Sequence, residues 1–208
     1  MNSKKYFNGI ANEWNTLSRS YFKEELRDLV LNKYDLNGKV VADLGAGTGF
    51  MSLKASQKAS IVFSLDVSKN MLNELNREIK IKEINNIYLL KSNFEKIPLF
   101  DESVDIVFMN MALHHAHNPN LVLKEIHRIL KIGGRVVITD VMKHEGEWAK
   151  EEMFDVWLGF NEIELQKWYL DVGFKEFNME DTRLEAIGES SFGEKIKPGI
   201  FLAEAIKL

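Results

Sequence analysis

Cysteine is absent from the 208-residue sequence. Its absence excludes disulfide bonds, thiolate metal sites and cysteine nucleophiles. Extended basic clusters are lacking too: 27 Lys and Arg stand against 31 Asp and Glu, the formal net charge is −4, and basic stretches such as 80–82 are short. The electrostatic footprint of a protein that binds a nucleic-acid backbone is therefore missing, and we expect no nucleic-acid partner.

Long apolar runs are also missing. No segment reaches the ~18 apolar residues of a membrane span, and residues 1–15 lack the continuous apolar stretch of a secretory signal. Together with the absence of cysteine, this favours a soluble, cytoplasmic protein. Hydrophobic residues make up 45% and charged residues 28%, which is typical of a globular chain. The length suits one domain, which we expect to span residues 1–208.

Short β-branched segments alternate with helical patterns from residue 37 onward, which is typical of a parallel sheet built from crossover units. The expected fold class is α/β, with a doubly wound, mostly parallel, seven-stranded sheet and helices on both faces. Strands are predicted over residues 39–44, 61–65, 87–90, 104–109, 135–140, 174–179 and 200–206. Helices are predicted over residues 49–57, 69–82, 120–130 and 162–172.

A glycine-rich turn follows the first predicted strand, with the sequence Asp43-Leu44-Gly45-Ala46-Gly47-Thr48-Gly49. Glycine permits unusual backbone dihedrals and lets a ligand approach closely, and the amides of a following helix start attract polar groups. A dinucleotide fingerprint would require a small residue where Phe50 stands. The Asp43 carboxylate would repel a pyrophosphate but suits a ligand that carries an ammonium group. The loop therefore favours an adenosine cofactor other than a dinucleotide.

The turn at residues 43–49 resembles the first motif of the class I S-adenosylmethionine-dependent methyltransferases. Later segments resemble the further motifs of that family in the same order, at residues 61–66, 92–98, 104–115 and 130–135. The resemblance covers roughly residues 37–140. It implies a Rossmann-like methyltransferase fold, S-adenosylmethionine as the cofactor, and methyl transfer as the reaction.

Particular residues acquire roles from this resemblance. Asp43 and the backbone of residues 45–49 would bind the methionine end, with the carboxylate near the ammonium group. Asp66 would bind the ribose hydroxyls, although capping of the next helix is an alternative for this acid. Asn93 and Phe94 would lie beside adenine; the family commonly has an acid at the first of these positions, and an amide can still donate and accept there. The predicted set is completed by Val67, Met71 and Asn110.

Three of the five histidines, His114, His115 and His117, follow the fourth predicted strand. Ligands of open α/β sheets bind beyond the carboxyl ends of the strands, so we expect His115 to line the pocket. It is the candidate proton acceptor, and the alternative is that it holds backbone and cofactor in place. No carboxylate lies at an evident ligand spacing, so no metal site is expected. Methyl transfer needs alignment more than an acid–base pair, and a dedicated catalytic residue is not required.

The acceptor is expected to be a small molecule. Superfamily members that methylate base amino groups resemble one another in an Asn/Asp-Pro-Pro-aromatic sequence, whereas residues 110–113 read Asn-Met-Ala-Leu. Arsenite methylation would require thiolates, which the chain lacks. The acceptor atom, whether oxygen, nitrogen or carbon, stays open, and so does the oligomeric state.

Two flanking segments carry aromatic residues. Residues 1–36 are expected to form either a lid or an edge of the core. Within them, the segment from Tyr6-Phe7 through Trp14 resembles the start of quinone-biosynthesis methyltransferases. Residues 141–173 are expected to cover the substrate, with ordinary helix packing as the alternative. Within them, residues 155–160 resemble a segment of bacterial methyltransferase domains that are sometimes fused to winged-helix regulators. Residues 174–208 are expected to add the C-terminal strands.

Two other functions stay open. A non-catalytic protein that senses S-adenosylmethionine would need the same pocket as an enzyme. A nicotinamide-dependent oxidoreductase is opposed by Asp43 and Phe50.

Overall fold

The structure is a computed structural model that describes residues 3–21 and 23–208. Residues 1, 2 and 22 belong to the N-terminal segment predicted as a lid or edge and lie outside the described residues. None of the helices in the described part of the chain combines the length and apolar character that crossing a membrane requires.

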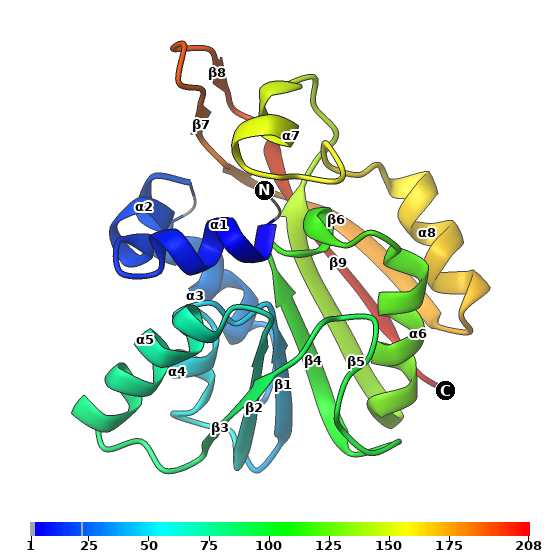
Figure 1. The fold of residues 1–208 in the computed structure, drawn as a ribbon. Helices are drawn as coiled ribbons and strands as arrows, with labels where there is room; N and C mark the ends of the chain where they lie inside the picture. The colour runs from blue at the N-terminus through cyan, green and yellow to red at the C-terminus, as the bar shows by residue number, and fades with distance from the viewer. Residues whose placement is uncertain (1–2, 22) are drawn as a thin grey trace.

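A seven-stranded sheet forms the centre of the fold, with the strand order β3-β2-β1-β4-β5-β9-β6 (Figure 1). Strands β1 to β5 pair in parallel, and β9 runs antiparallel between β5 and β6. The expected doubly wound, mostly parallel α/β fold is thereby confirmed. The strands are β1 (Val40–Leu44), β2 (Ile61–Asp66), β3 (Ile87–Lys91), β4 (Val104–Asn110), β5 (Leu130–Val141), β6 (Lys175–Glu185) and β9 (Gly199–Ile206).

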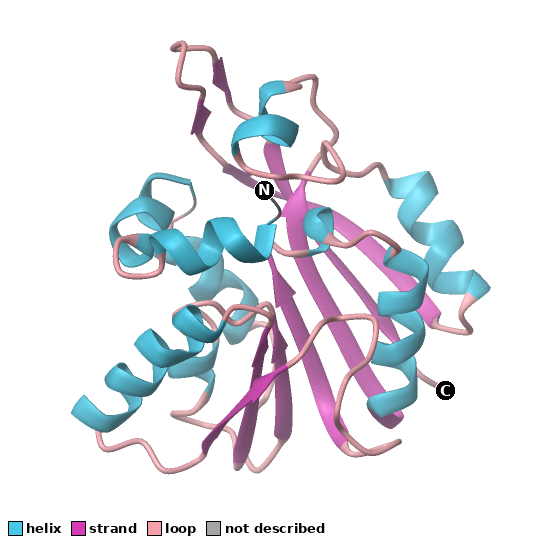
Figure 2. Ribbon diagram, viewed as in Figure 1, coloured by secondary structure: helices cyan, strands magenta, loops and turns pink. Residues whose placement is uncertain are grey.

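Helices cover both faces of the sheet, and each face buries its own apolar cluster (Figure 2). One cluster contains buried side chains of α3 (Glu24–Asn32), α4 (Ser52–Ala55) and α5 (Lys69–Ile81). The other contains buried side chains of α6 (Pro119–Ile129) and α8 (Glu162–Asp171). Burial of both faces explains why the central strands read as nearly continuous apolar runs.

Three helices begin at polar caps that the sequence supplies. The Ser68 hydroxyl accepts a hydrogen bond from the Met71 amide at the start of α5. The Asn118 side chain caps α6, with Pro119 in the first turn, and the Asn161 side chain caps α8. Such caps satisfy amides that have no partner within the helix, so they fix where each helix starts.

Strands β2 and β3 lie on one side of β1, and β4 and β5 lie on the other, so the strand order reverses between β1 and β4. Open α/β sheets bind ligands at such a switch point, beyond the carboxyl ends of the strands. Two N-terminal helices, α1 (Ser3–Ile10) and α2 (Trp14–Tyr21), lie over this end of the sheet (Figure 1). The Ser68 hydroxyl and the Asn70 side-chain amide donate to the side-chain and backbone oxygens of Asn8, each at 2.8 Å. These bonds attach α1 to the first turn of α5.

Four segments differ from the sequence prediction. The helix predicted over 49–57 is shortened to α4, and Gly49 lies outside it because its φ of +98° is one that a helix does not allow. The strand predicted over 174–179 continues as β6 to residue 185. Strand β5 starts at residue 130 rather than 135, so the glycine pair lies within it. The hairpin of β7 (Gly188–Glu189) and β8 (Lys195–Ile196) was not predicted, because two-residue strands are too short to show an alternating pattern.

Candidate functional site

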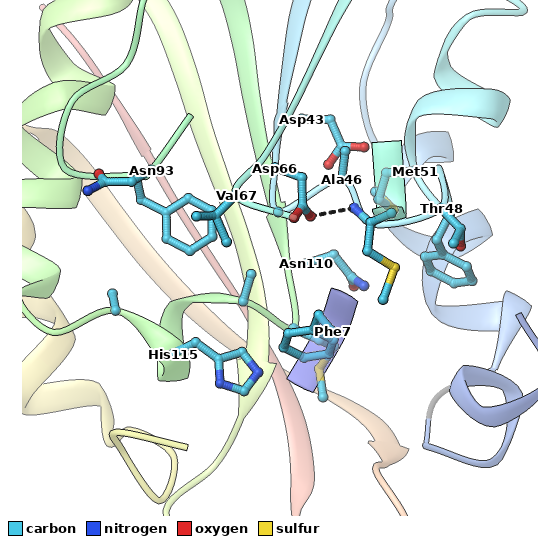
Figure 3. Close-up of a pocket in the computed structure, with 18 of the residues that line it drawn as sticks. Phe7, Asp43, Ala46, Thr48, Met51, Asp66, Val67, Asn93, Asn110 and His115 are labelled. Atoms are coloured by element: carbon cyan, nitrogen blue, oxygen red, sulfur yellow. Dashed lines mark hydrogen bonds between the residues drawn. The ribbon is translucent and has the colours of Figure 1, made fainter. Parts of the chain in front are cut away.

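A main cavity of about 290 Å³ lies at the carboxyl ends of β1, β2 and β4 (Figure 3). Its walls include His115 and every predicted cofactor residue except Gly49. The predicted residues that line it are Asp43, Gly45, Ala46, Gly47, Thr48, Asp66, Val67, Met71, Asn93, Phe94 and Asn110. The structure therefore brings together predicted residues from four separate segments of the sequence, 43–48, 66–71, 93–94 and 110–115.

The glycine loop turns back against β2. The amides of Gly45 and Ala46 both donate to the Leu65 carbonyl, at 2.9 and 3.0 Å. Gly45 has a φ of +76°, and a Cβ there would lie 2.6 Å from the Cβ of Ala112. A side chain at Gly45 would be strained and would collide with the opposite wall, so this glycine keeps the cavity open.

Gly49 does not line the main cavity. Its φ is +98°, and a Cβ on it would lie 2.4 Å from Leu75 Cδ1, on α5. This glycine permits close packing of the loop against the neighbouring helix. Its role is thus in packing, and direct ligand contact for this residue stays a prediction.

Asp43 is buried at the end of β1, with its side chain directed toward the loop (Figure 3). Its Oδ2 accepts a hydrogen bond of 2.5 Å from the Ser52 hydroxyl, which also contacts the Ser64 hydroxyl at 2.6 Å. Burial raises the pKa of Asp43 to about 7, and the nearby Asp66 adds to this, whereas the hydrogen bonds from Ser52 oppose it. A cationic ligand group at this carboxylate would favour its ionised form.

Asp66 lies at the end of β2 and is also buried. Its Oδ2 accepts from the Gly47 amide at 2.9 Å, and its Oδ1 accepts from the Ser68 amide at 2.7 Å. Burial raises the pKa of Asp66 despite these bonds. The helix itself is capped by the Ser68 hydroxyl, so Asp66 links the glycine loop to the segment that enters α5.

The predicted adenine wall lies at the rim of the cavity. The Asn93 side-chain oxygen accepts from the Glu95 amide at 2.6 Å, which shapes the turn after β3. The ring of Phe94 borders the glycine loop, because a Cβ added to Gly45 would lie 3.4 Å from its Cζ atom. Asn110, at the end of β4, accepts at its side-chain oxygen from the Thr139 hydroxyl at 2.7 Å. Each side chain is held in place by neighbours within the fold.

Several lining residues were not among those predicted from the sequence. Phe7 and Trp14 reach the main cavity from α1 and α2, and their rings lie 5.2 Å apart. Phe7 also packs 5.1 Å from the His115 ring. The aromatic face of the N-terminal segment was the sequence signal for these two. The remaining unpredicted lining residues are Phe50, Met51, Glu95, Met111, Ala112, Ala116 and His117.

His115 belongs to a short 3-10 helix, η1 (Leu113–His115), that follows β4. Its ring lines both the main cavity and a second cavity of about 70 Å³. Burial, together with the charge of His114, lowers the pKa of His115 well below its ordinary value. The ring is therefore neutral near pH 7 and faces the place where the two cavities adjoin.

His114 is buried beside two carboxylates. Its Nδ1 lies 2.6 Å from Asp140 Oδ1, and its Nε2 lies 3.7 Å from Asp155 Oδ1. Although burial lowers the pKa of His114, the charges of Asp140 and Asp155 raise it to about 9. The sequence shows no carboxylate at a ligand spacing near these histidines, because Asp155 is remote in sequence and is brought close only by folding. The expectation of no metal site stays a prediction.

The region predicted to cover the substrate divides in two. Met153 and Ala149, near α7 (Trp148–Glu152), line the second cavity. Trp157 and Phe160 instead pack near Trp168 of α8, at ring distances of 5.4 and 5.9 Å. The first part therefore forms a cavity wall, and the second belongs to the core.

Comparison with known proteins finds similar sequences and a similar fold. The model of the family described as a methyltransferase domain matches residues 42–138. The chain is 33% identical over 138 residues to malonyl-[acyl-carrier protein] O-methyltransferase of Hamiltonella defensa, covering 62% of this chain and 52% of the relative. It is 27% identical over 179 residues to the chloroplastic 2-methyl-6-phytyl-1,4-hydroquinone methyltransferase of Spinacia oleracea, covering 84% and 49%. The chain thus spans about half the length of these curated relatives.

A solved structure supports the fold. The crystal structure of an S-adenosylmethionine-dependent methyltransferase from Aquifex aeolicus has a TM-score of 0.69 to this chain at 24% identity, covering 95% of this chain and 98% of that one. The likeness extends beyond the segment that the family model matches. The chain is thus similar to methyltransferase domains over residues 42–138, and it has the fold of the Aquifex aeolicus methyltransferase over nearly its whole length.

Proposed function

We propose that this chain transfers a methyl group from S-adenosylmethionine to a small-molecule acceptor. The observation that carries the proposal is the convergence of the glycine loop, Asp43 and Asp66 on one cavity at the carboxyl ends of the parallel strands. A sulfonium cofactor with an ammonium group suits two buried carboxylates better than a pyrophosphate does. The cavity volume of about 290 Å³ suits a small cofactor or ligand.

The cofactor would lie along the loop. Asp43 and the backbone of residues 45–49 would take the methionine end, whose ammonium group would restore the ionised form of the carboxylate. Asp66 would accept from the ribose hydroxyls in addition to its bond with Gly47. Asn93 and Phe94 would flank adenine at the rim. The walls between these ends would come from Val67, Met71 and Asn110.

The acceptor would approach from the second cavity. The two cavities share Phe7, Trp14, Met111 and His115, so these residues stand where the methyl group would pass. Most other residues of the second cavity are apolar, which favours an acceptor with an apolar body. Two relatives are named for a phytylhydroquinone and for a malonyl-[acyl-carrier protein], so proteins similar to this chain differ in the chemistry of their acceptors.

Catalysis would rest on alignment. Transfer from a sulfonium is an in-line displacement, so the protein gains most by holding donor and acceptor atoms in contact and by excluding water. The Phe7 and Trp14 rings would exclude water as a lid formed by residues 1–36. His115 would line the acceptor side. The absence of cysteine and the acidic net charge support a cytoplasmic location and a partner other than nucleic acid.

An assay of S-adenosylhomocysteine release tests the proposal. The protein is incubated with S-adenosylmethionine and a panel of apolar phenols, carboxylic acids and amines, and product is measured by mass spectrometry. Acceptor-dependent turnover supports the proposal. Cofactor binding without turnover over the whole panel favours a non-catalytic S-adenosylmethionine-binding protein, and a melting temperature shifted only by a nicotinamide cofactor favours an oxidoreductase.

A further inference from the structure

The wall of the second cavity contains a buried carboxylate oxygen that the proposed methyl transfer does not use. Asp155 has a side-chain exposure of 7%, and among the described residues no hydrogen-bond partner reaches its Oδ1. This oxygen lies 3.7 Å from His114 Nε2 and 3.5 Å from His115 Nδ1. A buried acceptor without a hydrogen-bond donor is costly, so either a charge on His114 or a bound cation must compensate this oxygen.

The fold holds Asp155 against the two histidines through backbone contacts. The amides of Val156 and Trp157 both donate to the His114 carbonyl at 3.0 Å. The Trp157 indole nitrogen donates to the Ala116 carbonyl at 2.9 Å. The segment that carries Asp155 is therefore fastened directly to the 3-10 helix that carries the histidines.

We propose that His114, His115 and Asp155, called the His–Asp cluster below, bind a divalent transition-metal ion, with Zn²⁺ as the best fit. The three ligand atoms lie within 4.8 Å of one another. Imidazole nitrogens and a carboxylate oxygen are a donor set that zinc accepts, and three protein ligands with one open position are typical of its reactive sites.

Asp140 contacts His114 on the side of its ring opposite to Asp155 and would orient it as a metal ligand. Its Oδ1 lies 2.6 Å from His114 Nδ1, and its Oδ2 accepts from the His114 backbone amide at 3.2 Å. Metal-binding histidines commonly donate their second ring nitrogen to a carboxylate, which orients the ring and strengthens it as a ligand. With neutral imidazoles, the charges of Asp140 and Asp155 would balance those of one divalent ion.

The spacing requires a modest contraction. In a tetrahedral zinc site, ligand atoms lie about 3.4 Å apart, as bond lengths near 2.0–2.1 Å dictate. The two distances to Asp155, 3.5 and 3.7 Å, are already close to that value. The three ligand atoms lie within 4.8 Å of one another, so metal binding would draw the two histidine nitrogens together by at most about 1.4 Å, through rotation of the imidazole rings.

The open position would face the second cavity, which is lined by all three residues and by His144. A zinc ion there would bind an oxygen or nitrogen of the acceptor and lower its pKa. Metal binding does not depend on the proposed function, whereas this use of the metal does. The competing occupant is a proton on His114, held between the two carboxylates.

Metal titration of the purified, chelator-treated protein separates these occupants. Isothermal titration with Zn²⁺, and visible absorption with Co²⁺ as the spectroscopic probe, are carried out on the wild type and on Asp155→Asn, His115→Ala and Asp140→Asn. His127→Gln serves as the control, because this histidine lies on α6 and packs against Phe174, away from the His–Asp cluster. We expect one equivalent of metal, the strong absorption of tetrahedral Co²⁺, and wild-type behaviour in the control.

The variants should lose affinity for the metal ion to different degrees. Asp140→Asn should weaken binding about 10–100-fold, as loss of a carboxylate behind a ligand typically does. Asp155→Asn and His115→Ala should weaken it further, while a cooperative thermal unfolding transition verifies that each variant is folded. Titration of the wild type with S-adenosylmethionine is carried out separately. Absence of saturable metal binding in the wild type, or unchanged affinity in both ligand variants, overturns the proposal. Because the cofactor titration is a separate readout, failure of the metal site leaves the proposed function standing.

Discussion

The proposed cofactor side, in the main cavity, and the proposed acceptor side, in the second cavity, are built in different ways. The cofactor side uses residues 43–48 and Asp66, which meet because consecutive parallel strands end at the same edge. The acceptor side joins the histidines after β4 to Asp155, which reaches them only through a loop beyond β5. The order of strands and loops along the chain is therefore enough to predict the cofactor side, whereas the acceptor side depends on packing between distant segments.

The two buried carboxylates, Asp43 and Asp155, give the sharpest form of this comparison. Asp43→Asn keeps the size of the side chain but removes the charge that would meet the cofactor ammonium. We expect affinity for S-adenosylmethionine to fall by ~2–3 kcal/mol, about 30–150-fold, in calorimetric titration. Asp155→Asn should leave that affinity within about twofold. An equal loss of S-adenosylmethionine affinity in both variants would contradict the assignment of Asp43 to the cofactor side and of Asp155 to the acceptor side.

Gly49 tests whether every loop glycine serves ligand binding. Gly49→Ala places a Cβ against Leu75 at a φ of +98°, so the cost should fall on packing. We expect the free energy of unfolding to drop by ~2–3 kcal/mol and the melting temperature by about 5–10 °C. Cofactor affinity of the folded fraction should change little. A stable variant that has lost cofactor binding would instead show that this glycine acts on the ligand.

The titration of Asp43 provides a test on the unmodified protein. Its raised pKa, about 7, means that the folded chain holds a proton between pH 4 and 7 that the unfolded chain has released. The contribution of this group to stability is therefore present below pH 4 and is lost as the pH rises through 7. Asp43→Asn should remove this dependence and melt above the wild type at pH 8.

Cofactor affinity should follow the opposite trend. Binding an ammonium group favours the ionised carboxylate, so the Kd for S-adenosylmethionine should rise by up to about tenfold per pH unit below pH 7. In Asp43→Asn this slope should be absent. A Kd that is flat from pH 5.5 to 8 in the wild type would show that Asp43 does not meet the ammonium.

The smallest effect on cofactor affinity is expected from Phe7→Ala, in the N-terminal segment that is proposed to act as a lid. Phe7→Ala removes ring contacts with Trp14 and His115, and we expect cofactor affinity to fall by ~1 kcal/mol, about fivefold. Amide hydrogen exchange of residues 3–21 should slow when the cofactor binds. Unchanged exchange there would mean that the N-terminal helices are only an edge of the core.

Much of the fold and of the cofactor side could be predicted from the sequence. Apolar segments followed by turn residues predict the strands of the sheet. The spacing of Gly45 and Gly47 after the first strand predicts a cofactor-binding loop. Asp66 was predicted as a ligand-binding acid, and its backbone partners, the amides of Gly47 and Ser68, appear only in three dimensions.

The acceptor side could not be predicted in the same way. The contact of Asp155 with His114 and His115 depends on a loop whose backbone bonds leave no periodic signal. Phe7 and Trp14 were visible as an aromatic face, but periodicity does not distinguish a cavity wall from a core contact. Pairings of this kind follow from packing between distant segments.

The central claim, that the main cavity holds S-adenosylmethionine, is tested most directly by calorimetric titration at pH 8. The wild type, Asp43→Ala and Asp66→Ala are each titrated with S-adenosylmethionine and S-adenosylhomocysteine. We predict saturable one-to-one binding to the wild type and its loss in both variants, with all three proteins folded. No binding of either compound to the folded wild type would contradict the claim.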